Sequence, residues 1–406
     1  MTTTLIENAL VLRPGHWARP GSVLLKDGKI AEIDPQMDPA ESVDERVDAR
    51  QALLTPGLID IHCHGIGQFH YEADPPQIQD AAAVLPSFGT TCVLPTLYRV
   101  MNRASLGLLE RLSKALAQVE GVAMPGLHLE GPFLKLPGAG CETVPGDLVL
   151  LEELLAATGG RVSAMSVSPD TPHIIPVIER LRDQNIAVLM THTRASVEQT
   201  EAAIRAGARH ATHFYDVFPV PEEIEPGARP VGAVETILAD PRATVDFICD
   251  GVHVHPMAIR AALAAKGWEG IVAITDANIG AGLEEGVYET TWGYSVHVSP
   301  ANAARIADKQ HPLCGLLAGS ALTMDLAITN LLNWLDLPPH QVWAMGTANP
   351  AAVVHLANKG DIRVGADADL VLWDQGSNRL QAQKTWVAGK CVYDAQSEPC
   401  ALGEQQ

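Results

Sequence analysis

The sequence has no long apolar segment, no excess of basic residues and no closely spaced cysteine pair. No run of about 18 uncharged apolar residues occurs, so no transmembrane helix is expected. Residues 1–14 lack a basic segment followed by an apolar one, which argues against a secretory signal. Acidic residues outnumber basic ones by 48 to 28, a net charge of −20, and no basic face is visible. We therefore expect neither a membrane nor a nucleic-acid partner.

Cysteine and aromatic residues are also sparse. The seven cysteines are odd in number and scattered without a CxxC pair, which is typical of reduced thiols and predicts a cytoplasmic protein. Hydrophobic residues, in contrast, make up 47% of the 406 residues and charged residues 19%. This composition provides a large core and excludes a disordered chain.

The two ends of the chain share a pattern of short strands and turns. Residues 22–33 hold two apolar runs around Asp27 and Gly28, which is a strong hairpin signal. Residues 369–373 and 385–393 also read as strands, with Gly389 and Lys390 as a turn. Neither end has enough apolar surface to fold alone, and chain termini often lie close together. We predict one small β-sandwich domain built from residues 1–55 and 358–406.

Between the ends, short apolar and β-branched runs alternate with helical stretches. The runs cover residues 58–61, 90–94, 126–129, 162–167, 186–190, 208–212, 244–248 and 271–275. Eight such units in about 300 residues predict an α/β fold, a (β/α)₈ barrel over residues 56–357. A doubly wound sheet is the alternative, but no glycine-rich dinucleotide loop follows the first run.

Side chains that can bind a metal follow these runs, where a barrel of this kind places its functional residues. They are His62, His64, Glu130, His192 and His213, and a further carboxylate, Asp276, follows the last run. His62 and His64 are two positions apart in a strand, so both point to one side. Imidazole and carboxylate ligands suit Zn²⁺ or Fe²⁺. The pattern predicts a site for one or two divalent ions.

Such a site suits the hydrolysis of an amide. A bound divalent ion lowers the pKa of its water to about 7 and polarises a carbonyl. The reaction also needs a group that takes a proton from the water and gives it to the leaving amine. Asp276 is the predicted catalytic acid and base; the alternative is a structural cap on the turn that follows it.

Several blocks resemble the amidohydrolase superfamily and, within it, the N-acetylglucosamine-6-phosphate deacetylases. They read PGLIDIHCH at 56–64, GLHLEGPF at 126–133, THT at 191–193, ATH at 211–213, DGVHVH at 250–255, TD at 275–276 and LAGS at 317–320. Together with the terminal strands, this resemblance covers nearly the whole chain. It implies a homodimer that removes acetyl from an N-acetyl amino sugar.

The resemblance also implies a role for each site residue. Glu130, His192 and His213 would hold the main ion, and His62 and His64 a second one, with Asp276 as the catalytic acid and base. The substrate site would lie at Glu142, Tyr215, Asp216, Val217, Arg229, Asp250, His253, Leu317, Ala318 and Gly319.

Three positions depart from the family pattern. Glu142 stands where the family has His or Gln, and Asp216 where it has Asn. Ile224 replaces an Arg that helps to bind phosphate, although Arg229 lies nearby. Like charges about 4 Å apart cost roughly 1–4 kcal/mol at intermediate dielectric, so such a pocket disfavours a phosphate dianion. The alternatives are an unphosphorylated N-acetyl sugar, another amide with hydroxyl or cationic groups, or a phosphate bound through Arg229 and His253.

Other reactions and a non-catalytic role are further alternatives. The same scaffold could serve an N-acyl-amino-acid hydrolase, a cyclic amide hydrolase or a deaminase, but the blocks above favour deacetylation. A barrel kept as a binding module would lack a ligand or the acid, and all of them are present here.

Overall fold

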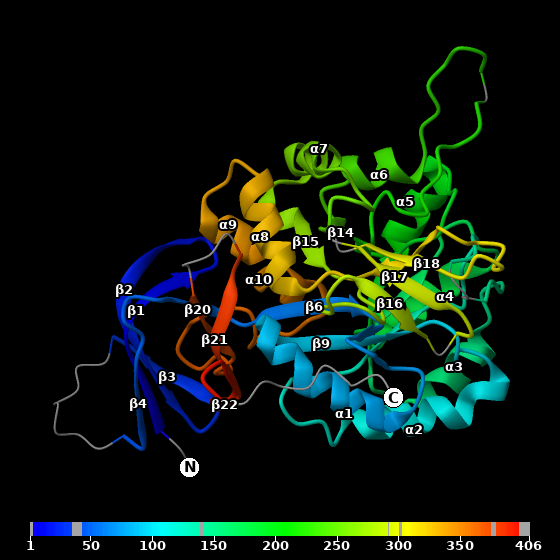
Figure 1. Cartoon of the computed structure of the whole chain (residues 1–406). Helices are drawn as coiled ribbons and strands as arrows, with labels where there is room; N and C mark the ends of the chain where they lie inside the picture. The colour runs from blue at the N-terminus through cyan, green and yellow to red at the C-terminus, as the bar shows by residue number, and fades with distance from the viewer. Residues whose placement is uncertain are drawn as a thin grey trace.

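The first and last strands of the chain meet in one sheet beside a barrel, as the computed structural model shows (Figure 1). The structure describes residues 3–34, 43–138, 142–223, 225–290, 292–299, 303–374 and 379–397. Ile224 and Cys141 lie outside these ranges.

The terminal sheet contains eight strands. They are β1 (Thr3–Arg13), β2 (His16–Lys26), β3 (Lys29–Ile33), β4 (Glu45–Asp48), β5 (Leu53–Pro56), β20 (Leu370–Asp374), β21 (Gln381–Val387) and β22 (Lys390–Asp394). Their order is β22-β21-β20-β5-β1-β2-β3, and β4 pairs with β1. The β5–β20 pairing joins the two ends of the chain, which confirms the predicted β unit. Its boundaries at residues 55 and 358 stay a prediction.

The two predicted hairpin turns have different outcomes. Asp27 and Gly28 join β2 to β3 with φ of 52° and 78°, so this turn is confirmed. The second turn lies one residue earlier than predicted, at Ala388 and Gly389, with φ of 46° and 74°. Both turns need two left-handed residues in succession, which glycine adopts without steric cost.

The barrel consists of eight parallel strands in chain order, and all eight predicted runs are confirmed. They are β6 (Leu58–Cys63), β9 (Thr90–Leu97), β10 (Leu127–Glu130), β11 (Val162–Val167), β12 (Ala187–Met190), β13 (His210–Ala211), β14 (Thr244–Ile248) and β15 (Ile271–Ile274). The barrel closes between β15 and β6: Asp276 N donates to His62 O at 2.9 Å, and His64 N donates to Ala277 O at 2.8 Å.

Helices cover the barrel in the intervals between its strands. They are α1 (Pro75–Val84), α2 (Leu106–Leu116), α3 (Leu148–Ala157), α4 (Ile174–Asp183), α5 (Val197–Ala206), α6 (Ala233–Ala239), α7 (Pro256–Lys266), α8 (Met324–Trp334), α9 (Pro339–Met345) and α10 (Ala348–Val353), with 3₁₀ turns η1 (Leu85–Phe88), η2 (Arg103–Ser105) and η3 (Trp268–Gly270). Within the described ranges, none of these helices is long and apolar enough to cross a bilayer.

An antiparallel sheet is inserted between β15 and α8. Its strands are β16 (Gly286–Glu289), β17 (Ser295–Val298), β18 (Ala303–Ile306) and β19 (Leu317–Ser320). A short hairpin of β7 (Gly65–Ile66) and β8 (Phe69–His70) follows the first barrel strand. A bridge between Ala277 and Ser320 fixes β19 beside the end of β15.

Candidate active site

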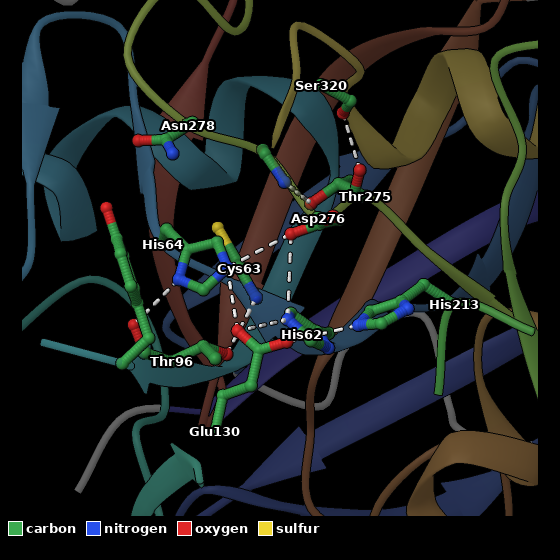
Figure 2. A network of polar contacts seen from close by, with 12 residues as sticks. His62, Cys63, His64, Thr96, Glu130, His213, Thr275, Asp276, Asn278 and Ser320 are labelled. Atoms are coloured by element: carbon green, nitrogen blue, oxygen red, sulfur yellow. Dashed lines mark hydrogen bonds and ion pairs between the residues drawn. The ribbon is translucent and has the colours of Figure 1, made fainter. Parts of the chain in front are cut away.

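The five predicted metal ligands and Asp276 converge at the carboxyl ends of the barrel strands, and Figure 2 labels all of them except His192. Glu130 lies at the centre. Its Oε1 is 3.2 Å from Nε2 of His192 and 3.1 Å from Nε2 of His213. Its Oε2 is 3.6 Å from Nε2 of His62 and 3.5 Å from Nε2 of His64. Asp276 Oδ1 completes the group, 3.6 Å from Nε2 of His62 and 3.0 Å from Nε2 of His64.

Strand geometry and unusual backbone angles produce this convergence. His62 and His64 share one face of the chain at the end of β6, while the buried Cys63 directs its thiol to Gly65 O on the other side. His192, His213 and Asp276 lie just beyond the ends of their strands, with φ of 48°, 34° and 47°. Non-glycine residues rarely adopt such angles, and strained backbone of this kind clusters at functional sites.

Hydrogen bonds behind the first two histidines orient their rings. His64 Nδ1 donates to Thr96 O at 3.1 Å, and His62 Nδ1 contacts Thr212 Oγ1 at 2.8 Å. Each bond leaves Nε2 directed at the two carboxylates. Partners of this type commonly hold metal-binding histidines in the required tautomer.

The cluster fits a divalent metal ion. His62 Nε2 is buried and has no hydrogen-bond partner among the described residues. Ligand atoms of His62, Glu130 and His213 lie within 4.8 Å of one another, as do those of His62, His64 and Asp276. Two ligands about 2.1 Å from a tetrahedral ion are about 3.4 Å apart. The separations of 3.0 to 3.6 Å between ligand atoms in the cluster bracket that value.

The charges of the cluster depend on one another. Burial opposes protonation of His64 and His213, but the neighbouring carboxylates raise the pKa of His64 to about 9 and of His213 to about 10. Burial likewise opposes ionisation of Asp276, yet His62 and His64 lower its pKa to about 2. The imidazoles also hold the pKa of Glu130 well below its usual range. Both carboxylates therefore stay ionised and attract cations.

A pocket of about 350 Å³ opens above this cluster. Its lining residues are His64, Tyr98, Glu130, Gly138, His192, His213, Asp216, Val217, His253, Asp276, Asn278, Leu316, Leu317 and Gly319. A Cβ atom on Gly138 would lie 2.2 Å from Cε1 of His192, so only glycine lets this loop pass so close.

The predicted substrate residues fall into two groups. Asp216, Val217, His253, Leu317 and Gly319 line the pocket. Glu142 is exposed and accepts a hydrogen bond from Asn102. Tyr215 packs on Phe214, and Ala318 is buried in the inserted sheet.

Two further predicted substrate residues, both charged, also lie outside the lining of the pocket. Asp250 is buried and contacts His253 Nδ1 through its Oδ2 at 2.6 Å. Arg229 has a side chain that is 80% exposed and pairs with Glu235.

The sequence prediction missed Tyr98, Gly138, Asn278 and Leu316. Tyr98 directly follows β9, which extends to Leu97 rather than ending at Leu94 as predicted. The other site residues were identified because they follow a predicted strand. Tyr98 would have been identified in the same way if the end of β9 had been predicted correctly.

Comparison with known proteins gives a consistent result. The amidohydrolase family model matches residues 53–393. An N-acetylglucosamine-6-phosphate deacetylase from Lysinibacillus sphaericus is 30% identical, over 95% of this chain and 97% of the relative. An N-acetylgalactosamine-6-phosphate deacetylase from Escherichia coli O157:H7 is 31% identical, over 96% and 99%.

Solved structures agree in fold. The N-acetylglucosamine-6-phosphate deacetylase from Pasteurella multocida superimposes with a TM-score of 0.83 at 23% identity, covering 96% of this chain and 99% of that one. A point mutant of the Mycobacterium smegmatis enzyme, in complex with N-acetyl-D-glucosamine-6-phosphate, gives 0.80 at 26% identity, covering 97% and 100%. The chain thus belongs to the amidohydrolase family and is a hydrolase that acts on amide carbon–nitrogen bonds.

Proposed function

We propose that the chain removes the acetyl group from an N-acetylated amino sugar, with Asp276 transferring the proton. The position of Asp276 carries this proposal. Its carboxylate lines the pocket and lies 3.0 Å from Nε2 of His64, beside a cluster suited to a metal. The names of the relatives, deacetylases of glucosamine and galactosamine derivatives, support the same reaction class.

Two sets of residues would hold the metal. Glu130, His192 and His213 would hold one divalent ion, zinc or iron, and His62 and His64 would hold a second. When bound, such an ion supplies Lewis acidity, which polarises the amide carbonyl and lowers the pKa of water to about 7.

Asp276 and His253 would supply the remaining chemistry. The low pKa of Asp276 keeps its carboxylate ionised, so that it accepts the proton of the attacking water. The same carboxyl then donates the proton to the nitrogen of the departing amine. Asp250 holds Nδ1 of His253, which leaves Nε2 in the pocket wall to contact the substrate.

Asp276→Asn tests this proposal. We expect kcat for acetate release to fall about 10²- to 10⁴-fold in the metal-loaded protein, because the amide cannot transfer the proton. The bound metal should remain, since the five residues proposed to hold it are intact. Asp336→Asn, which changes an exposed residue, is the matched control. Activity within threefold of the unmodified protein in Asp276→Asn would refute the role of Asp276.

The assembly and location of the enzyme also belong to this proposal. The family resemblance supports a homodimer, which light scattering after size-exclusion chromatography would test. The five described cysteines are all free, which supports the proposed cytoplasmic location.

A further inference from the structure

Asp216 adds a further carboxylate to the lining of the active-site pocket. The imidazoles of the lining each have a carboxylate partner. Asp276 pairs with His64, Glu130 with His192 and His213, and Asp250 with His253. The side chain of Asp216 makes no hydrogen bond or ion pair with any residue in the described ranges, although it lines the same pocket.

No lysine or arginine among the described residues lines this pocket. Arg229 is the basic residue closest in sequence to Ile224, the position at which a phosphate-binding arginine was expected. Its side chain is 80% exposed, and Nη2 lies 2.7 Å from Oε1 of Glu235, so it is already paired outside the pocket. A phosphate dianion bound here would face the Asp216 carboxylate without a lysine or arginine of the described lining to neutralise it.

The backbone holds Asp216 in this position. Its neighbours Tyr215 and Val217 both have positive φ, 78° and 54°, and Val217 O accepts a hydrogen bond from Thr193 N. The Tyr215 ring packs against the rings of Phe214 and Phe247. The loop is therefore anchored on both sides of Asp216, which limits its retreat from a bound ligand.

We infer that Asp216 selects against phosphorylated substrates, so that the pocket takes an N-acetylated sugar with a free hydroxyl at the end remote from the amide. The carboxylate accepts a hydrogen bond from that hydroxyl. The relatives named above are deacetylases of sugar 6-phosphates. The inference rests on the proposed deacetylation and adds the substrate class.

The test compares kcat/KM for acetate release from N-acetylglucosamine, N-acetylgalactosamine and their 6-phosphates. The measured quantity is kcat/KM for a free sugar divided by kcat/KM for its 6-phosphate. Because both values depend equally on the amount of folded protein, partial unfolding of a variant does not change this ratio. We expect the unmodified protein to prefer a free sugar at least tenfold. Asp216→Asn should lower this ratio at least tenfold, in favour of the phosphorylated sugar. Asp336→Asn, which removes the same charge from an exposed site, should leave the ratio unchanged.

Two results would overturn the inference. One is a preference of 10²-fold or more for a phosphorylated sugar in the unmodified protein, about 2.7 kcal/mol. The other is an equal ratio in Asp216→Asn and the unmodified protein.

A binding measurement separates this inference from the proposed function. Calorimetric titration of metal-loaded Asp276→Asn with each sugar and its phosphate gives the same ratio without turnover. A free-sugar preference in binding with no hydrolysis of any of the four compounds by the unmodified protein would reject the deacetylase proposal and support the role of Asp216.

Discussion

His70 is a buried histidine one aromatic ring away from the metal cluster. Its ring lies 6.1 Å from that of Tyr98, which in turn lies 4.8 Å from the ring of His64. Neither ring nitrogen of His70 has a hydrogen-bond partner among the described residues. Burial, reinforced by charge on His64 and Arg99, lowers the pKa of His70 to about 3. The folded protein therefore keeps this ring neutral at every pH above that value.

A neutral buried histidine makes stability depend on pH. The unfolded chain protonates His70 below about pH 6.5, whereas the folded chain does not, so stability falls as the pH decreases from 6.5 toward 3. His70→Phe removes this contribution to the pH dependence of stability. When the pH decreases from 7.5 to 5.0, the unmodified protein should lose about 2 kcal/mol more unfolding free energy than the variant. This difference is the gain of the variant.

Urea denaturation at the two pH values measures this gain. Burial raises the pKa of Glu72 in the same cavity, which contributes with the opposite sign, but this contribution is common to both proteins and cancels. His16→Gln, at an exposed position, controls for the loss of one histidine. A gain below about 0.5 kcal/mol would show that His70 is protonated in the folded state.

At the residue scale, sequence reasoning found residues that follow strands and missed those defined by tertiary contact. The rule located His62, Glu130 and Asp276, because the carboxyl ends of parallel strands meet at one face. Gly138 lies in a loop well after Glu130, and only its contact with His192 reveals its importance. His128 shows why a histidine alone is a poor signal: it bonds Ile61 O and Ser166 inside the barrel.

Helix α5 begins with a complete capping box. Ser196 Oγ accepts a hydrogen bond from Gln199 N, and Gln199 Oε1 accepts one from Ser196 N. We expect Ser196→Ala to lower the free energy of unfolding by about 1 kcal/mol, because a helix N–H loses its acceptor. Ser105 precedes α2 at the same position without a side-chain bond, so Ser105→Ala is a matched control. Equal midpoints of urea unfolding for the two variants would contradict the assigned role.

At the element scale, the period of apolar residues predicted all eight barrel strands but not all of their lengths. β9 continues past the predicted end at Leu94 to Leu97, and it tolerates Pro95 because a proline need not donate where the ladder is irregular. The inserted sheet β16–β19 has no counterpart among the predicted runs. All four of its strands are just four residues long and partly exposed, which leaves little hydrophobic pattern to detect.

Trp373 joins the terminal sheet to the barrel. Its Nε1 donates to Thr55 Oγ1 at 2.8 Å, and its ring lies 5.3 Å from that of Trp343 in α9. Gly89, immediately before β9, makes room for it, since a Cβ there would lie 2.2 Å from Cη2 of Trp373. The ring is fully buried between the two units.

Removal of this ring should destabilise the whole molecule. Trp373→Ala leaves a cavity and removes the hydrogen bond to Thr55 Oγ1, so we expect a loss of about 3–5 kcal/mol. Trp17→Ala, which truncates a 70% exposed tryptophan in β2, serves as the comparison and should cost less than about 1 kcal/mol. The urea midpoint followed by far-UV circular dichroism gives both values. Similar midpoints for the two variants would mean that the junction is not a shared core.

The pairing of β5 with β20 also has a consequence for the synthesis of the chain. β5 has β1 on one side and β20 on the other, and the whole barrel is translated between them. Until residues 370–374 leave the ribosome, β5 presents unpaired backbone groups, and such an edge is a template for aggregation. The nascent protein is thus most vulnerable after its barrel strands are complete and before its last strands arrive, which is when a chaperone would help it most.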